Sequence, residues 1–471
     1  MYKIGSYLHI NIIRIAIVLS GFISLYTQAP SWLGGLGQEL AFYPFAIGLA
    51  IWLAGIILCR EKVHIPRNHS FYAFAFLLIW LLLTGIANMN NMLEAEFKGT
   101  DGITRFIIQY GTMVFYFLSA LYIYNVFCKL ALSKEKVLML FENAIMLSAY
   151  IMGAYSFFEI TSLLGMEYCR EIVNVIDTLF RIDEVQGDIF AYVRIRSLTA
   201  ESSYFGMYCG VIMPWLVWRA FDNTVSPTKR TFNLLFLVYY IVLIIFSLSR
   251  NAYFIVLIEI LVFGIVYRKK LMRNLIAMGA KVGAFLIVVM AALMWAISST
   301  AVIEIDVLGV LLSFTNSSNN IHELSNIARL GSQWAGWYMF LDNPFFGVGY
   351  GQYPFYYADY VPGWAWMSSE VQLWGLNITG SVMTPSHGIY TRLLAETGFM
   401  GFLAWLFILF SMLCGICKSD VDLNRKRCYL MSIVALILFG LNIDAFRIFY
   451  YWVFLGGVYF LERRPVNDGR V

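Results

Sequence analysis

Apolar runs separated by short polar connections occupy almost the whole chain. Many of them reach about 17 to 25 residues, the length that lets a helix cross about 30 Å of hydrocarbon. The pattern predicts an all-α, polytopic integral membrane protein, with residues 1–471 forming a single membrane-embedded domain. We expect about twelve transmembrane helices, at about residues 10–27, 41–58, 71–88, 106–127, 138–164, 203–219, 232–248, 251–267, 275–297, 391–417, 429–445 and 447–462.

The positions of the basic residues orient these spans. Lys and Arg collect in cytoplasmic connections, and alternate connections of this chain hold them: Arg60, Lys62, Arg67, Lys129, Lys134, Lys136, Arg219, Lys229, Arg230, Arg268, Lys269, Lys270, Arg273, Lys418, Arg425, Lys426, Arg427, Arg463 and Arg464. The opposite connections contain few basic residues and most of the acidic ones. Both termini are therefore predicted to be cytoplasmic.

Two long segments then face outward, into the periplasm if the membrane is a bacterial inner membrane. One is the loop at about 165–202, and the other is the large loop at about 298–390 between the ninth and tenth helices. Every predicted cytoplasmic connection is short, and no G-x-x-x-x-G-K-[ST] phosphate loop occurs. We therefore expect the function to face outward, with the catalytic segment in the 298–390 loop, and we do not expect a nucleotide-driven pump.

Composition supports a membrane class and excludes a soluble enzyme domain. Hydrophobic residues make up 60% and charged residues 13% of the chain, whereas soluble domains carry roughly 25% charged residues. The seven cysteines are scattered, and the Cys414–Cys417 pair ends an apolar run, so we predict neither a disulfide framework nor redox chemistry. The net charge of +4 is modest, and we expect no nucleic-acid partner.

The end of the first outward loop holds Arg194, Arg196 and Glu201 where the sixth span begins. A helix N-terminus carries partial positive charge and free N–H groups, so this stretch is a candidate anion site. In the alternative interpretation, Glu201 and Ser202 cap the helix and the arginines contact lipid headgroups.

Arg250 lies between two spans that are separated by almost no loop. A charge near the edge of the hydrocarbon is costly unless it is paired or faces a wet cavity. Because basic residues are scarce on this side, Arg250 is a candidate ligand-binding residue. Alternatively, its side chain extends to the interface.

The large loop contributes Arg329, Asp342, His387, Arg392 and Glu396. Arginine binds phosphate oxygens bidentately and stays charged, while a histidine can take a proton from a hydroxyl at neutral pH. No cluster of His, Cys and Asp suggests a metal site. The combination suits a metal-independent and cofactor-independent reaction in which a sugar hydroxyl displaces a pyrophosphate from a lipid-held donor.

The same stretches resemble the O-antigen polymerases and O-antigen ligases, which are glycosyltransferases of the bacterial inner membrane. The resemblance covers roughly residues 190–410 and rests on Arg194 to Gly206, Ser249-Arg250, Arg329 with Asn343 to Gly349, and His387 followed by Leu394, Glu396, Gly398 and Gly401. It implies that His387 activates the acceptor, and that Arg250 and Arg329 contact the pyrophosphate of an undecaprenyl-pyrophosphate-linked oligosaccharide. Arg194, Arg196 and Glu201 are further binding candidates.

Glu201-Ser-Ser-Tyr204 resembles the Glu-Pro-Ser-Tyr stretch of the polymerases, with serine in place of proline, so we favour a polymerase. A ligase that transfers the finished glycan to lipid A core is the first alternative. A transporter of lipid-linked sugars is the second, in which Glu159, Glu259 and Lys281 would line the path. Besides the lipid-linked glycan, membrane lipids and a chain-length-regulating membrane protein are the expected partners.

Overall fold

A computed structural model of the chain describes residues 2–25, 27–30, 32, 39–129, 133–180, 194–222, 224–249, 252–259, 261 and 321–463. These residues are almost entirely helical, which confirms the predicted all-α polytopic class. Among the described helices, six are long and apolar enough to cross a membrane by length and composition: α2 (Phe42–Cys59), α3 (His69–Ala87), α5 (Gly102–Lys129), α6 (Lys134–Leu163), α9 (Pro227–Phe246) and α15 (Ile389–Lys418).

Four further helices run beside them: α1 (Tyr2–Ile23), α8 (Ser202–Ala220), α16 (Leu423–Phe439) and α17 (Phe449–Leu461). Residues 252–259 also form a helix. The rest of the predicted span at 251–267 beyond residue 261, and the whole of the span at 275–297, lie outside the described residues. All other predicted spans coincide with helices.

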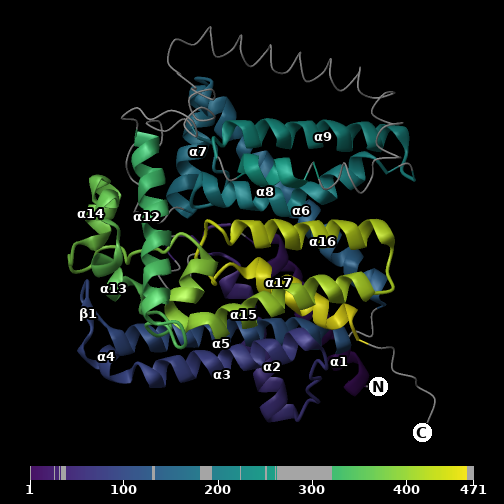
Figure 1. Ribbon diagram of the computed structural model, residues 1–471. Coiled ribbons are helices and arrows are strands. Elements are labelled where there is room, and N and C mark those ends of the chain that lie inside the picture. The colour runs from purple at the N-terminus through teal and green to yellow at the C-terminus, as the bar shows by residue number, and fades with distance from the viewer. Residues whose placement is uncertain are drawn as a thin grey trace.

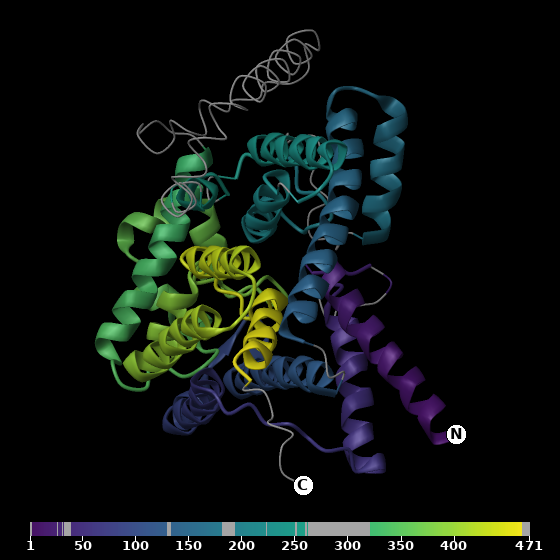
Figure 2. The same ribbon diagram turned by 90° about the vertical axis from the view of Figure 1, so that its right-hand side faces the viewer.

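Helix α17 forms the centre of the bundle. It is apolar on every side, and all its residues are buried, as expected for a helix with no polar face. It packs on α5, while α15 packs on α3 and α16 on α8. The view along the bundle in Figure 2 shows the yellow C-terminal helices enclosed by earlier ones. The last helices to be synthesised therefore complete the core.

The helix ends that are predicted to be cytoplasmic, which we call the inner ends, meet at one end of the molecule. Glu462, just after α17, lies close to Lys134 and Lys418, which belong to the inner ends of α6 and α15. Side chains cap two of the helices here: Ser133 accepts a hydrogen bond from the N–H of Lys136, and Asp422 accepts from two N–H groups at the start of α16. In Figure 1 this end is on the right.

Short elements cover the opposite, outer end. They are α4 (Met89–Glu94), a hairpin of β1 (Glu96–Phe97) and β2 (Thr100–Asp101), α7 (Glu167–Phe180), α12 (Ile321–Asp342), α13 (Tyr353–Tyr360), the 3-10 helix η3 (Gly363–Met367) and α14 (Ser369–Gly375). Figure 1 shows α12 crossing the ends of the horizontal helices. It is held to α13 and η3 by a separate small core that includes Ala328, Ala335, Met339, Tyr357 and Ala365.

The structure corrects the predicted end of one span. The helix expected at 429–445 ends at Phe439, and residues 440–448 are non-helical. Hydropathy does not detect this break because Leu441, Ile443 and Phe446 keep the segment apolar. The break exposes a connection at the outer end that carries Asp444 and Arg447.

Candidate functional site

His387 lies at the outer end of the bundle, one residue before the N-cap Gly388 of α15. Its main chain has a left-handed φ of 52°, which is unfavourable for a residue with a side chain. The amide of Gln333 on α12 holds this backbone by donating to the carbonyl oxygens of His387, at 2.8 Å, and of Leu441, at 2.9 Å. Gln333 thus ties three outer segments together at the histidine.

Asp444 approaches His387 from the connection between α16 and α17. Its Oδ2 accepts hydrogen bonds from the N–H of Ser386, at 2.7 Å, and from the Ser386 hydroxyl, at 3.2 Å. Burial raises the pKa of Asp444, but the charge of Arg392 and the hydrogen bonds from Ser386 act against it, and the pKa stays below its usual value. The carboxylate is therefore ionised at neutral pH.

The imidazole of His387 is half-buried, and its Nε2 is a buried atom without a hydrogen-bond partner among the described residues. Burial lowers the pKa of His387 to about 4, Asp444 opposes this shift, and Arg329 adds to it. The ring is therefore neutral at neutral pH. The indole of Trp374 lies beside it, with ring centroids 5.0 Å apart.

Arg329 carries the positive charge that helps to lower the pKa of this ring. It lies on α12, one turn before Gln333, and its side chain is half-buried. Among the described residues, no ion pair or hydrogen bond engages its guanidinium. Because no described residue takes up its five N–H donors, Arg329 is a candidate for binding an anion.

A buried arginine supports the connection that carries Asp444. Arg392, on α15, donates to the Glu396 carboxylate at 3.0 Å, to the Asp444 carbonyl oxygen at 2.9 Å and to the Gln109 amide oxygen at 2.9 Å. Its guanidinium also lies over the rings of Tyr350 and Phe446. Each of the three nitrogens of Arg392 thus donates a hydrogen bond within the protein, so we assign it to the positioning of other groups.

The first outward loop contributes a second cluster. Arg196 pairs with Asp177 of α7, with a nitrogen–oxygen distance of 2.6 Å, and Tyr155 donates to the same carboxylate. The Glu159 carboxylate accepts from the N–H groups of Arg196 and Ser197. Glu159, a candidate for a transport path, is thus bound to the backbone of this loop.

Glu201 occupies the N-cap position of α8 but makes no capping hydrogen bond to the backbone. Its exposed carboxylate accepts from the Ser203 hydroxyl at 3.0 Å. Tyr204 lies within electrostatic range of Glu201, Asp444, Glu39 and Arg447. The start of α8 therefore lies close to the connection that carries Asp444.

One of the predicted binding arginines, Arg194, lies near the end of α9. Arg194 is within electrostatic range of Tyr253, and the neighbouring N–H of Ile195 donates to the carbonyl oxygen of Phe246. Arg250 lies outside the described residues. Asp342, at the far end of α12, accepts a hydrogen bond from Tyr360.

Sequence reasoning missed Asp444, Gln333, Gln109 and Arg447. Arg447 is exposed at the outer end, within electrostatic range of Glu39, whose pKa burial raises to about 7. One signal was available: Asp444 and Arg447 interrupt an otherwise apolar stretch, where charges are costly without a role. The amides of Gln109 and Gln333 carry no comparable signal.

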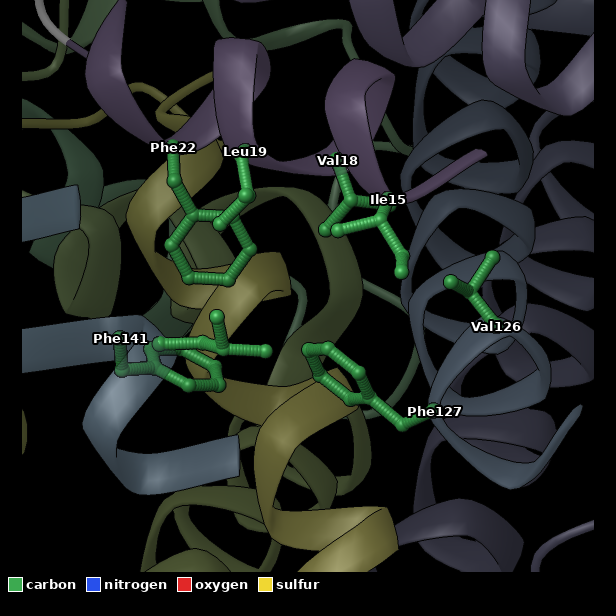
Figure 3. A pocket seen from close by; sticks show the side chains of 8 residues that line it. Ile15, Val18, Leu19, Phe22, Val126, Phe127 and Phe141 are labelled. Atoms are coloured by element: carbon green, nitrogen blue, oxygen red, sulfur yellow. The ribbon is translucent and has the colours of Figure 1, made fainter. Parts of the chain in front are cut away.

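A pocket between α1, α5 and α6 has a different character (Figure 3). Its lining is entirely apolar: Ile15, Val18, Leu19, Phe22, Val126, Phe127, Leu140 and Phe141. It lies towards the inner end, where α5 ends and α6 begins, and offers no group that could bind a sugar or a phosphate. Among the described residues, no group of three His, Cys, Asp or Glu side chains could hold a metal ion.

Comparison with known proteins finds one similarity, which covers part of the chain. The family model described as O-antigen ligase matches residues 235–406, a range that includes Arg329, His387 and Arg392 and ends before Asp444. No curated protein matches the chain. The family match confirms the predicted resemblance: residues 235–406 of this multi-pass membrane protein are similar to the O-antigen ligase family.

Proposed function

We propose that the chain is a glycosyltransferase that polymerises a lipid-linked surface polysaccharide. It moves the growing glycan from its undecaprenyl pyrophosphate carrier to the end sugar of another lipid-linked repeat unit. The reaction takes place on the periplasmic face of the bacterial inner membrane, and both termini face the cytoplasm. The concentration of Lys and Arg at the inner ends of the helices supports this orientation.

The single observation that carries the proposal is the buried Nε2 of His387, which has no partner among the described residues and belongs to a ring within electrostatic range of both Asp444 and Arg329. In the transfer, a hydroxyl oxygen of the acceptor bonds to the anomeric carbon of the donor, and the bond from that carbon to the pyrophosphate oxygen breaks. The hydroxyl proton passes to Nε2, and the electron pair of the broken bond leaves with undecaprenyl pyrophosphate. One displacement of this kind inverts the anomeric carbon.

Arg329 contacts the donor pyrophosphate and stabilises the charge that develops as it leaves. Its half-buried position strengthens this interaction relative to water. By the family resemblance, Arg250 contacts the same group, and Arg194, Arg196 and Glu201 complete the binding side. Arg196 must leave Asp177 to reach an anion, so we expect it to matter less than Arg329. These cations supply the neutralising charge, and we propose a reaction without metal ion or cofactor.

Donor binding also prepares the base. An imidazole whose pKa is about 4 is a weak base. A pyrophosphate beside Arg329 offsets the positive charge that lowers this pKa and adds negative charge of its own. His387 thus becomes a stronger base once the donor is bound, which limits proton transfer to the complete complex.

The description of the matching family as O-antigen ligase supports a second candidate, transfer of the finished glycan to lipid A core. The chemistry at His387 would be the same, and only the acceptor differs. The Glu201-Ser-Ser-Tyr204 stretch supports the polymerase instead. A chain-length-regulating membrane protein and membrane lipids are the partners proposed for a polymerase.

The test is the lipopolysaccharide ladder of a deletion strain that carries the wild-type chain, His387→Ala or the control His69→Ala, with equal amounts in the membrane. His69 is exposed at the inner start of α3. We expect a ladder with the wild type and the control, and core with one repeat with His387→Ala. A normal ladder from His387→Ala would refute the catalytic assignment. Long polymer left on its lipid carrier in the deletion strain would identify a ligase.

A further inference from the structure

The turn of the β1–β2 hairpin reaches across the outer end to the segment that leads into His387. Lys98 forms this turn with Gly99, and both residues have left-handed backbones, with φ of 53° and 75°. Only 3% of Lys98 is exposed, although lysine is almost never buried unless it is paired. The buried ammonium group of Lys98 must therefore be stabilised by hydrogen-bond partners.

Four hydrogen bonds join Lys98 to this segment, and we refer to them as the Lys98 clasp. The ammonium donates to the carbonyl oxygens of Val382, at 2.7 Å, and Leu373, at 3.3 Å. The Lys98 N–H donates to Asn377 Oδ1 at 2.5 Å, and the Lys98 carbonyl accepts from the N–H of Gly380 at 3.3 Å. All four partners lie within ten residues of one another, so the clasp fixes the whole turn that they form.

The clasped segment has no regular structure to hold it. Helix α14 ends at Gly375 and α15 begins at Ile389, so contacts with other elements must fix residues 376–388. At one end the clasp binds it, and at the other end Asp444 and Gln333 bind Ser386 and His387. Leu373 precedes Trp374, whose ring lies beside His387. The clasp therefore fixes both the segment that leads into His387 and the backbone next to the ring that lies beside it.

We infer that Lys98 is a positioning residue for the transfer reaction: through the clasp it holds the 373–387 segment so that His387 and Trp374 keep their places at the site. This inference rests on the proposed function of His387. Lys98 itself does not contact substrate. Because catalysis by a base needs the reacting atoms aligned, loss of the clasp should lower the rate without preventing the bundle from folding.

Lys98→Met tests the ammonium alone, because the two backbone hydrogen bonds of residue 98 remain possible. In the complemented deletion strain, we expect the rate of polymer formation to fall about 10- to 100-fold, the size of effect that a misplaced catalytic group produces. Asn377→Ala, at an exposed position, removes a different bond of the clasp and should give a smaller loss in the same direction. Lys136→Met changes an exposed lysine at the inner end and should leave the ladder normal.

A cross-link can replace the clasp. A Cβ atom built on Gly99 would lie 3.8 Å from the Cβ of Thr379, which is within the range of disulfides. Gly99→Cys with Thr379→Cys should therefore form a bond that joins the same two segments in the oxidising periplasm. Cys169, which is partly exposed on α7, is changed to Ser in this background to prevent mispairing. Each single cysteine variant reports the effect of its own substitution.

The decisive strain combines Lys98→Met with the cysteine pair. We expect the oxidised cross-link to restore most of the ladder that Lys98→Met loses, and a reductant added to the cells to remove the restored part. A general folding role would not respond to the reductant at constant protein level.

A normal ladder from both Lys98→Met and Asn377→Ala, or a complete cross-link that restores nothing, would overturn the inference. If Lys98→Met does not accumulate, Asn377→Ala takes its place. Its ladder is then compared with and without the cross-link, and a complete cross-link that restores nothing would again overturn the inference. A full ladder from His387→Ala would instead refute the proposed function, so the two failures are distinct.

Discussion

The carboxylate of Asp444 accepts two hydrogen bonds from Ser386, the residue that precedes His387. Asp444 therefore acts on the histidine twice, by fixing the backbone beside it and by placing negative charge near its ring. Arg392 holds the Asp444 main chain and is itself paired with Glu396. Two separate parts of the sequence, residues 386–396 and the connection that carries Asp444, are thus joined by contacts that reach the residue next to His387.

Asp444→Asn should reduce transfer roughly 10- to 100-fold, the effect expected when a catalytic group is misplaced or loses its supporting charge. An asparagine can still accept a hydrogen bond from Ser386, so the loss will come mainly from the missing charge. The rate of ladder formation measures it, and Asp420→Asn, at an exposed inner position, is the control. Equal rates for Asp444→Asn and the wild type would mean that Asp444 is only structural.

The pH dependence of kcat/KM should show that the His387 ring is buried. Its pKa of about 4 lies below the ordinary value of 6.5, so the neutral, proton-accepting form persists as the pH falls below 6.5. We expect kcat/KM of the purified chain in liposomes to stay level from pH 7 to about 5 and to decline towards 4. Bound donor raises this pKa, so the decline in kcat should begin at higher pH than that in kcat/KM.

The folding stability should also depend on pH through His387, and it should decrease as the pH falls. Between pH 6.5 and about 4 the unfolded chain binds a proton at His387 that the folded chain does not. The contribution to folding stability is therefore full above pH 6.5 and is lost as the pH falls to about 4. His387→Ala should remove this part of the pH dependence.

For the kinetic prediction, a decline in kcat/KM centred near pH 6.5 would show that the ring is not desolvated.

Much of this arrangement could be predicted from the sequence, and the reasons for the rest are physical. The lengths of the apolar runs were enough to predict the helices, because the thickness of the bilayer sets the length of a span. The break before Asp444 was missed because its neighbours are as apolar as the helix that it ends. The interruption of α15 at Gly398, with φ of 64°, depends on a close approach to Phe345, which local sequence does not encode.

At the site, too, some residues could be predicted from the sequence and others only from the structure. His387 and Arg329 were predicted because their chemistry is rare on the outer side. Gln333 and Gln109 act through amide contacts with residues far away in the sequence. Arg392 was a candidate for the site, but only the structure shows that each of its three nitrogens donates a hydrogen bond within the protein. The type of residue thus indicated the chemistry, while the tertiary contacts decide which cations are available.

Arg329→Ala should weaken donor binding more than it alters folding, because no described ion pair depends on this side chain. Loss of charge-assisted hydrogen bonds worth about 1.5–3 kcal/mol corresponds to roughly 10- to 100-fold weaker binding. Binding of undecaprenyl pyrophosphate to the purified chain measures this, with Arg67→Ala at the exposed inner connection as the control. Arg329→Lys should recover only part, because an ammonium cannot bind bidentately. Unchanged affinity in Arg329→Ala would exclude Arg329 from the donor site.

Arg392→Leu should destabilise the protein, since it leaves the Glu396 carboxylate, which is 1% exposed, without its cation. Removing one partner of a buried ion pair costs about 3–5 kcal/mol, which thermal unfolding in detergent should detect, with Arg67→Leu unchanged. Arg392→Leu with Glu396→Leu should recover much of that stability, because the uncompensated charge is gone. The double variant should nevertheless remain slow in transfer, because Asp444 has lost the donor that holds its carbonyl. Recovery of both stability and rate would show that Arg392 serves Glu396 alone and has no part in positioning Asp444.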